Sequence, residues 1–171
     1  MNPQKLYLQP FENALTRLQE GFARYQTDIS DSQIRDGLIQ RYEFTYEISH
    51  KMLKRYLEST SPNPEIFDAM PFADLIRSGN EQALLLGDWT RWKLFREMRA
   101  KSSHTYDEGI ALEVISVIPD FIIEAKTLFE RLKLKNAWTS ASHFGQRSTV
   151  ANHPRYSDKS CPQDRSMGIW L

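Results

Sequence analysis

The sequence predicts an all-α protein, an up-and-down bundle of four main helices with one extra short helix. Two observations support this fold class. Apolar residues recur every three or four positions through most of the chain, as they do on the buried face of an α-helix. Short breaks rich in serine, asparagine, proline or glycine separate the long segments, and short connections favour antiparallel neighbours in a bundle.

The first half of the chain contains two of the main helices. The first presents an apolar stripe formed by Phe11, Leu15, Leu18, Phe22 and Tyr25. Asp28-Ile29-Ser30-Asp31 then offers cap residues for a second helix. On that helix Glu47 and Lys51 lie opposite the apolar face, at the i,i+4 spacing that favours an ion pair. The segment 59–64 ends the helix, because proline lacks a backbone donor and disfavours helix at the residue before it.

The second half contains a short helix and two further main helices. The short helical region spans Phe72 to Leu86, and Gly87-Asp88 provides a stop and a new cap. The third main helix carries Trp89, Trp92, Phe95 and Met98, whose spacing favours a buried stripe over a platform for stacked bases. Ser102 and Ser103 interrupt it. Thr105 and Glu108 have capping-box spacing, which predicts a last helix from Tyr106, bent at Pro119.

Composition restricts the classes of function. A chain of 171 residues that is 40% hydrophobic and 26% charged fits one soluble globular domain. Its formal net charge of zero argues against broad, nonspecific coating of nucleic acid, so any site for nucleic acid has to be a local patch. Residues 88–101 offer such a patch, with the basic residues Arg91, Lys93, Arg96, Arg99 and Lys101. Taken without the motif beside it, this segment is more simply explained as a solvated helix face.

The sequence also lacks the patterns typical of metal sites, disulfides and membrane segments. Cys161 is the single cysteine and the histidines have no zinc-site spacing, so we expect no disulfide, metal or cofactor. Residues 1–5 lack an apolar signal core, and no apolar run approaches the roughly 18 residues of a membrane span, so we expect a cytoplasmic protein without membrane association. Helical periodicity is lost near residue 136. We therefore divide the chain into a helical domain, 1–135, and an irregular tail, 136–171, in which His143, His153 and Cys161 are poor metal-site candidates.

The break between the last two helices carries the residues best suited to chemistry. Arg99 is followed by His104 and then by Tyr106. An arginine is permanently cationic and forks onto phosphate oxygens, whereas a histidine trades protons near neutral pH. Such a pair is able to cleave RNA without a metal, if the histidine handles the proton of the 2′-hydroxyl or of the leaving oxygen while the arginine stabilises the crowded phosphate. A structural histidine in the joint is the simpler alternative.

This motif resembles that of a known family. Arg-x4-His-x-Tyr followed by Asp107-Glu108 is similar to the HEPN domain, specifically the subgroup encoded beside minimal nucleotidyltransferases and also called nucleotidyltransferase substrate-binding proteins. A second stretch resembles the second helix of the same subgroup: Asp36-Gly37-Leu38-Ile39-Gln40-Arg41-Tyr42-Glu43-Phe44-Thr45-Tyr46-Glu47, followed by Lys51, Leu53 and Lys54. The resemblance covers roughly residues 4–135. Ala100 replaces a position that is usually polar, commonly asparagine, which bears on catalytic strength. His50 replaces a usual tryptophan, which we expect to affect packing.

The resemblance implies a toxin-like, metal-independent ribonuclease that forms a homodimer with its motif loops facing a shared cleft. It assigns catalysis to Arg99 and His104, and it makes Tyr106 the hydroxyl that a partner nucleotidyltransferase antitoxin adenylylates. Two alternatives stay open. The first is a noncatalytic substrate- or nucleotide-binding subunit of a nucleotidyltransferase complex, which Ala100 makes credible. The second is a purely structural helical partner.

Three further cations are candidates for contact with RNA or the partner. Arg96 and Lys101 belong to the basic patch beside the motif. Arg41 lies at the edge of an apolar helix face, where a guanidinium needs a carboxylate, a ligand or a partner chain. A snorkelling side chain is the alternative for Arg41.

Overall fold

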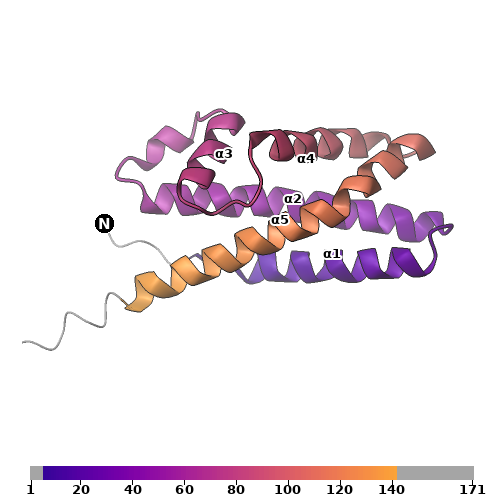
Figure 1. Cartoon of the computed structure of the whole chain (residues 1–171), viewed down its shortest axis with the longest axis horizontal. Helices are drawn as coiled ribbons and strands as arrows, with labels where there is room; N and C mark the ends of the chain where they lie inside the picture. Colours follow the sequence, from indigo (N-terminus) through magenta and orange to yellow (C-terminus); the bar gives the residue numbers. More distant parts are fainter. Residues whose placement is uncertain (1–5, 142–171) are drawn as a thin grey trace, which may run out of the picture.

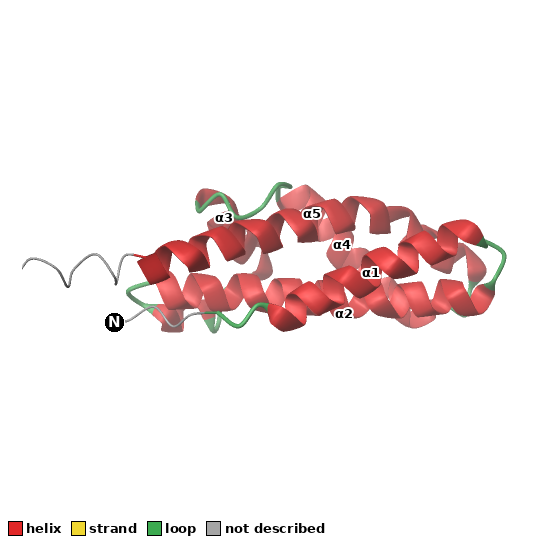
Figure 2. Cartoon of the chain, turned by 90° about the horizontal axis from the view of Figure 1, so that it is seen from below, coloured by secondary structure: helices red, strands yellow, loops and turns green. Residues whose placement is uncertain are grey.

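The computed structural model describes residues 6–141, and all regular elements in this range are helical (Figure 1, Figure 2). The predicted all-α bundle with one short helix is confirmed. Its α-helices are α1 (Gln9–Thr27), α2 (Ser32–Thr60), α3 (Phe72–Glu81), α4 (Trp89–Lys101) and α5 (Glu108–Ala141). Two short 3-10 turns join them, η1 (Pro64–Phe67) before α3 and η2 (Ser102–His104) after α4.

Each of the four longer helices packs against at least two of the others. α1 contacts α2, α5 packs on both of them, and α4 contacts α2 and α5, while α3 rests on α2 and α4. Figure 1 shows that the connection from α4 to α5 lies at the same end of the bundle as the turn between α1 and α2. This end therefore brings the motif residues 99–106 close to the start of α2.

The helix starts test the predicted caps. Asp31 accepts hydrogen bonds from the backbone N–H groups of Gln33 and Ile34, and Asp88 accepts one from Arg91, so both predicted caps are confirmed. The predicted Thr105–Glu108 capping box is wrong. α5 begins at Glu108, and the Asp107 carboxylate accepts from the Ile110 N–H at 3.2 Å. Residues 102–104 continue as a 3-10 turn, and aspartate is a stronger N-cap than threonine.

The end of α3 differs from its prediction. The helix stops at Glu81 and does not continue through the apolar run to Leu86. Ala83 has a φ of 54°, while the Leu84 N–H donates to the Gly79 carbonyl and the Ala83 N–H to the Asn80 carbonyl. These bonds form a Schellman motif, which satisfies the last carbonyls of the helix and reverses the chain. The reversal turns Leu84 and Leu85 into the core.

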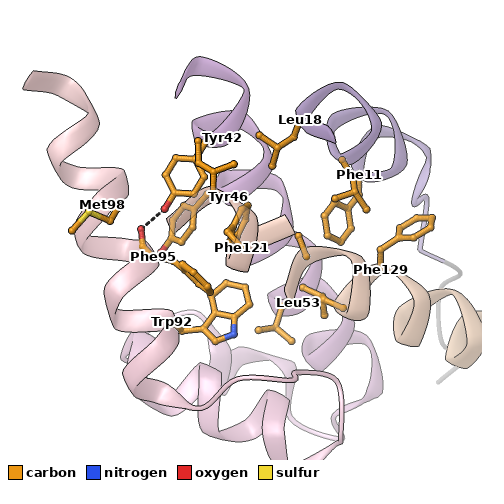
Figure 3. Packing of buried hydrophobic residues seen from close by; sticks show 14 of the residues in the cluster. Phe11, Leu18, Tyr42, Tyr46, Leu53, Trp92, Phe95, Met98, Phe121 and Phe129 are labelled. Carbon is orange, nitrogen blue, oxygen red and sulfur yellow. Dashed lines mark hydrogen bonds between the residues drawn. The ribbon is translucent and has the colours of Figure 1, made fainter. Parts of the chain in front are cut away.

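Aromatic side chains from three helices form the centre of the core (Figure 3). Tyr42 and Tyr46 of α2, Trp92 and Phe95 of α4, and Phe121 of α5 meet in edge-on and tilted pairs. The Tyr42 hydroxyl donates to the Phe95 carbonyl at 2.7 Å, and burial raises the pKa of both tyrosines, which keeps both phenols neutral. The prediction that the aromatic residues of the third main helix are core is confirmed for Trp92 and Phe95.

A fully buried carboxylate joins the loop before α4 to α5. Glu124 lies within the apolar stripe of α5 and has no exposed surface. It accepts from the backbone N–H groups of Leu86 and Gly87, at 2.9 and 2.7 Å, and from the Trp92 indole at 3.1 Å. A buried charge is tolerated only when hydrogen bonds replace its hydration, and three donors do so here.

The last helix runs past the predicted domain boundary. α5 continues through Pro119 and past residue 136 to Ala141. The side chain of Asn136 exchanges two hydrogen bonds with the backbone of Leu6, which ties the helix to the start of the chain. The rest of the predicted tail, with His143, His153 and Cys161, lies outside the described residues. Within residues 6–141, no helix combines the length and the apolar character that crossing a bilayer requires.

Replacing Glu124 tests whether its three hydrogen bonds hold α4 in place. Glu124→Gln keeps the shape but turns an N–H group towards one of the backbone donors. We expect it to lower the free energy of unfolding by about 1–3 kcal/mol, the usual cost of an unsatisfied buried group. Urea denaturation measures the change. Glu130→Gln, at an exposed position of the same helix, is the control and should change it by less than about 0.5 kcal/mol. Equal effects would contradict this role of Glu124.

Candidate functional site

Arg99 is held at the end of α4 by two carboxylates of α2. Its Nη1 lies 3.4 Å from Glu43 Oε1, and its Nε lies 3.3 Å from Glu47 Oε1. Glu43 and Glu47 are one helical turn apart, so both face the arginine from the same side of α2. The Arg99 side chain is 30% exposed, and its Nε makes no aligned hydrogen bond within the described residues. The two carboxylates therefore orient the guanidinium while part of the side chain stays exposed to solvent.

Ser102 links the end of α4 to the same carboxylate. Its hydroxyl contacts Glu43 Oε1 and lies 2.7 Å from the Arg99 carbonyl, so that Glu43 joins Arg99 to the first residue of η2. Serine competes with the helical backbone for hydrogen bonds, which is one reason α4 ends here. The carboxylate of Glu43 thus sets both the direction of Arg99 and the start of the joint.

His104 and Tyr106 lie in the joint on the solvent side. His104 is exposed, and within the described residues its imidazole makes no hydrogen bond. The Tyr106 ring stands edge-on to it, with centroids 6.1 Å apart and planes at 81°. Tyr106 is 88% exposed, whereas the core tyrosines Tyr42 and Tyr46 are buried. Both functional groups are free to meet a molecule from solution.

Two ion pairs anchor the joint on either side. Arg35, near the start of α2, lies 3.0 Å from Glu108 at the start of α5. Lys101, at the end of α4, lies 2.6 Å from Glu113. These pairs fix the ends of the segment 102–107 and leave its middle, where His104 and Tyr106 lie, exposed.

The predicted contact residues occupy three different environments. Arg41 donates to the Arg17 carbonyl of α1 at 2.7 Å and packs over Gly21, away from the joint. Lys101 pairs with Glu113. Arg96 is exposed and has no carboxylate partner within the described residues, and its guanidinium carbon lies 4.8 Å from the Phe72 ring centroid. None of these observations tests the predicted contacts with RNA or a partner.

Most of the predicted basic patch is neutralised by carboxylates. Arg91 pairs with Asp120 and Lys93 with Glu97, in addition to the pairs already described for Arg99 and Lys101. The expected pair between Glu47 and Lys51 is replaced by the contact between Glu47 and Arg99. The i,i+4 spacing allowed Glu47 to pair with Lys51, but the packing of α4 against α2 brings Arg99 within ion-pair distance of Glu47.

A groove of about 620 Å³ adjoins Arg99 between α2, η1, α3 and α4. We call it the Phe72 groove; its walls include Glu47, His50, Phe72, Arg96, Arg99 and Ala100. His50 does pack on a neighbour, with its ring centroid 5.2 Å from that of Phe72, but it also faces the groove that Arg99 borders. Burial lowers the pKa of His50 below its ordinary value, which favours the neutral imidazole at pH 7.

The sequence did not reveal the residues that contact Arg99 and Ser102. Glu43 and Glu47 looked like ordinary charges on a polar helix face, and Ser102 looked like a helix breaker. Their i,i+4 spacing was the available signal, since two carboxylates on one face often hold a cation. Among the described residues, no group of three or more histidine, cysteine, aspartate or glutamate side chains is arranged to hold a metal.

Comparison with known proteins agrees with this motif and this fold. Residues 6–134 match the family model described as "Nucleotidyltransferase substrate binding protein like". The chain belongs to the nucleotidyltransferase substrate-binding protein family. This HEPN-like family was the one indicated by the motif Arg-x4-His-x-Tyr and by the second helix, and the resemblance is confirmed.

Two relatives support the family assignment. The chain is 38% identical over 115 residues to "Probable ribonuclease HepT" of Haemophilus influenzae, a match that covers 65% of this chain and 78% of the relative. It also resembles the solved structure of HI0074 from Haemophilus influenzae, described as the fold of a substrate binding domain of a nucleotidyltransferase. That match has a TM-score of 0.70 and 33% sequence identity, and it covers 74% of this chain and 99% of the other.

Proposed function

We propose that this protein is a metal-independent ribonuclease of a toxin–antitoxin pair, in which Arg99 and His104 carry out the chemistry. The observation that carries the proposal is an arginine fixed at the end of α4, followed in the next turn by an exposed imidazole without a hydrogen-bond partner in the described chain. The name of the Haemophilus influenzae relative, a probable ribonuclease, supports it.

The proposed reaction is an internal transfer at phosphorus. The His104 imidazole accepts the proton of an RNA 2′-hydroxyl, and that oxygen attacks the adjacent phosphorus. The bond from phosphorus to the 5′-oxygen breaks, and this leaving oxygen takes a proton from water. The hydroxide so formed takes the first proton back from the His104 imidazolium. The products are a 2′,3′-cyclic phosphate and a 5′-hydroxyl. Charge builds on the phosphate oxygens during the attack, which is where a guanidinium is most effective.

The carboxylates leave Arg99 able to bind this phosphate. A guanidinium has five N–H donors, and Glu43 and Glu47 face the Nη1 and Nε sides of this one. The Nη2 donors and the second Nη1 donor remain for phosphate oxygens. Both ion pairs are partly exposed, and such pairs are weak enough to rearrange when a phosphate arrives.

We predict that the full chain cleaves RNA in the presence of EDTA, and that Arg99→Ala or His104→Ala lowers the rate at least a hundredfold, since each removes a group needed in the transition state. Gel analysis of total RNA and then of a defined RNA measures this. Arg55→Ala is the control, because Arg55 is an exposed arginine of α2 outside the joint. RNA that stays intact at high protein concentration would reject the proposal.

Glu43 is proposed as a positioning residue that acts through Arg99. Glu43→Ala should lower kcat about ten- to a hundredfold, because a slightly misplaced arginine loses its geometry towards the phosphate. KM should not rise, since a negative charge near the RNA is removed. Steady-state kinetics separate the two constants, and melting curves check the fold. Glu97→Ala, which removes an exposed carboxylate on α4, is the control. A matching loss in both variants would contradict the role of Glu43.

We further propose that two copies form a homodimer with the motif loops facing a shared cleft, and that a nucleotidyltransferase partner inactivates it at Tyr106. In the modification, the Tyr106 oxygen attacks the α-phosphorus of ATP, pyrophosphate leaves, and the phenolic proton passes to a base. The exposure of Tyr106 and its edge-on contact with His104 support this site. The added phosphodiester carries negative charge and bulk beside His104, where it would repel RNA phosphate.

The switch predicts a specific modification. Incubating the protein with the partner, ATP and magnesium should add one or more AMP units to Tyr106 and suppress RNA cleavage. Tyr106→Phe should keep cleavage and escape inactivation. Intact-mass analysis with peptide mapping identifies the residue. Tyr7→Phe is the matched control, because Tyr7 is also highly exposed, at 72%, but lies outside the joint. Labelling at another tyrosine would contradict the assignment.

A noncatalytic binding subunit is the second candidate. The observation that favours it is that Arg99 already faces two carboxylates, with Ala100 beside it in place of a polar side chain. In this case the protein presents substrate to a nucleotidyltransferase, and the cleavage assay in EDTA leaves RNA intact while a complex with the partner still forms.

A further inference from the structure

The Phe72 groove contains a cation that is not neutralised. Arg96 is exposed and, in the described part of the chain, faces no carboxylate within ion-pair distance. Its guanidinium lies over the Phe72 ring, 4.8 Å from the centroid, which holds the side chain by a cation–π contact. Arg96 thus keeps this contact with Phe72 while the residue as a whole stays exposed to solvent. Planar guanidinium groups held in this way stack against nucleic acid bases.

The same groove contains a neutral polar group. His50 is half-buried and packs against Phe72 with ring centroids 5.2 Å apart. A neutral imidazole offers one donor and one acceptor, which is the pairing found on the edges of bases. No hydrogen bond to another group within residues 6–141 uses either ring nitrogen. His50 is therefore able to form hydrogen bonds with a base in the groove.

The position of the groove connects it to the candidate site. Arg99 and Ala100 form part of its wall, so a molecule in the groove lies next to the side chain proposed to bind the phosphate. The volume of about 620 Å³ lies within the range typical of sites for small molecules. Its lining includes an aromatic ring, the unpaired cation of Arg96 and the imidazole of His50. Two carboxylates also line it, and both are paired, Asp68 with Lys54 and Glu47 with Arg99.

We propose that the Phe72 groove binds one nucleotide of an RNA strand, next to the phosphate held by Arg99, with its base stacked on Arg96 and its edge hydrogen-bonded to His50. This inference rests on the proposed ribonuclease function, because it takes the substrate to be RNA. Stacking on Arg96 tolerates any base, whereas the hydrogen bonds of His50 select among bases. The groove thereby gives the enzyme a sequence preference at one position beside the cleaved bond.

The test uses the full chain and a pool of short RNA oligonucleotides with randomised sequence, whose cleaved ends are sequenced. Arg96→Ala should lower kcat/KM about tenfold, the order expected for losing one stacked base. His50→Phe keeps the ring contact with Phe72 and removes the hydrogen-bonding nitrogens, so it should flatten the base preference at one position while leaving the melting temperature near that of wild type. Arg55→Ala is the control for loss of an exposed arginine charge.

A binding measurement tests the groove independently of the proposed ribonuclease activity. Fluorescence anisotropy with a labelled RNA oligonucleotide uses the His104→Ala chain, with and without Arg96→Ala. A roughly tenfold weaker affinity with Arg96→Ala, but not with Arg55→Ala, supports the groove even if the wild type cleaves nothing. If Arg96→Ala and His50→Phe cleave RNA at the same rate and with the same base preference as the control, the groove does not bind a nucleotide. The proposed ribonuclease function is not contradicted by that result. Absence of RNA binding by the His104→Ala chain would also overturn the proposal for the groove.

Discussion

The position of α4, and with it of Arg99, depends on the buried carboxylate of Glu124. The helix follows a loop that has no regular structure of its own, and Glu124 fixes that loop by accepting from two consecutive backbone N–H groups and from Trp92 in the first turn of α4. Gly87 permits this approach, because a Cβ there would lie 3.1 Å from Glu124 Oε2 and 2.8 Å from the Arg91 side chain. Trp92 then enters the aromatic core, and the helix delivers Arg99 to α2 at its far end.

Carboxylates hold both ends of α4, but they differ in how far they are buried. Glu124 is fully buried, so its hydrogen bonds are costly to break and serve the fold. Glu43 and Glu47 are partly exposed, and their pairs with Arg99 contribute little to stability. This difference suits their proposed roles. A fixed end sets the direction of the helix, while weak pairs at the other end orient an arginine without preventing it from binding a phosphate.

The sequence predicted what depends on neighbouring residues and missed what depends on distant ones. The helices, and the caps Asp31 and Asp88, follow from local periodicity and local hydrogen bonding. The start of α5 was misplaced because Thr105 and Asp107 both fit a cap, and the sequence does not show where the 3-10 turn ends. The partners of Arg99 were missed because Glu43 lies in another helix, and only packing of α4 on α2 brings the two together. Exposure of Tyr106 was predictable, since it follows from the break between helices.

The two positions at which the chain departs from the family pattern looked unrelated, because one belongs to the second helix and the other to the motif. In the folded chain His50 and Ala100 border the same groove, beside Arg99. Ala100 contributes only a methyl group to this wall, and the imidazole of His50 offers the groove a donor and an acceptor. If the groove holds a nucleotide, as we propose, these substitutions change which base fits and leave Arg99 and its carboxylates in place. Selectivity and chemistry would then vary separately within one site, because different side chains of α2 serve them: Glu43, outside the groove, orients Arg99, while His50 lines the groove.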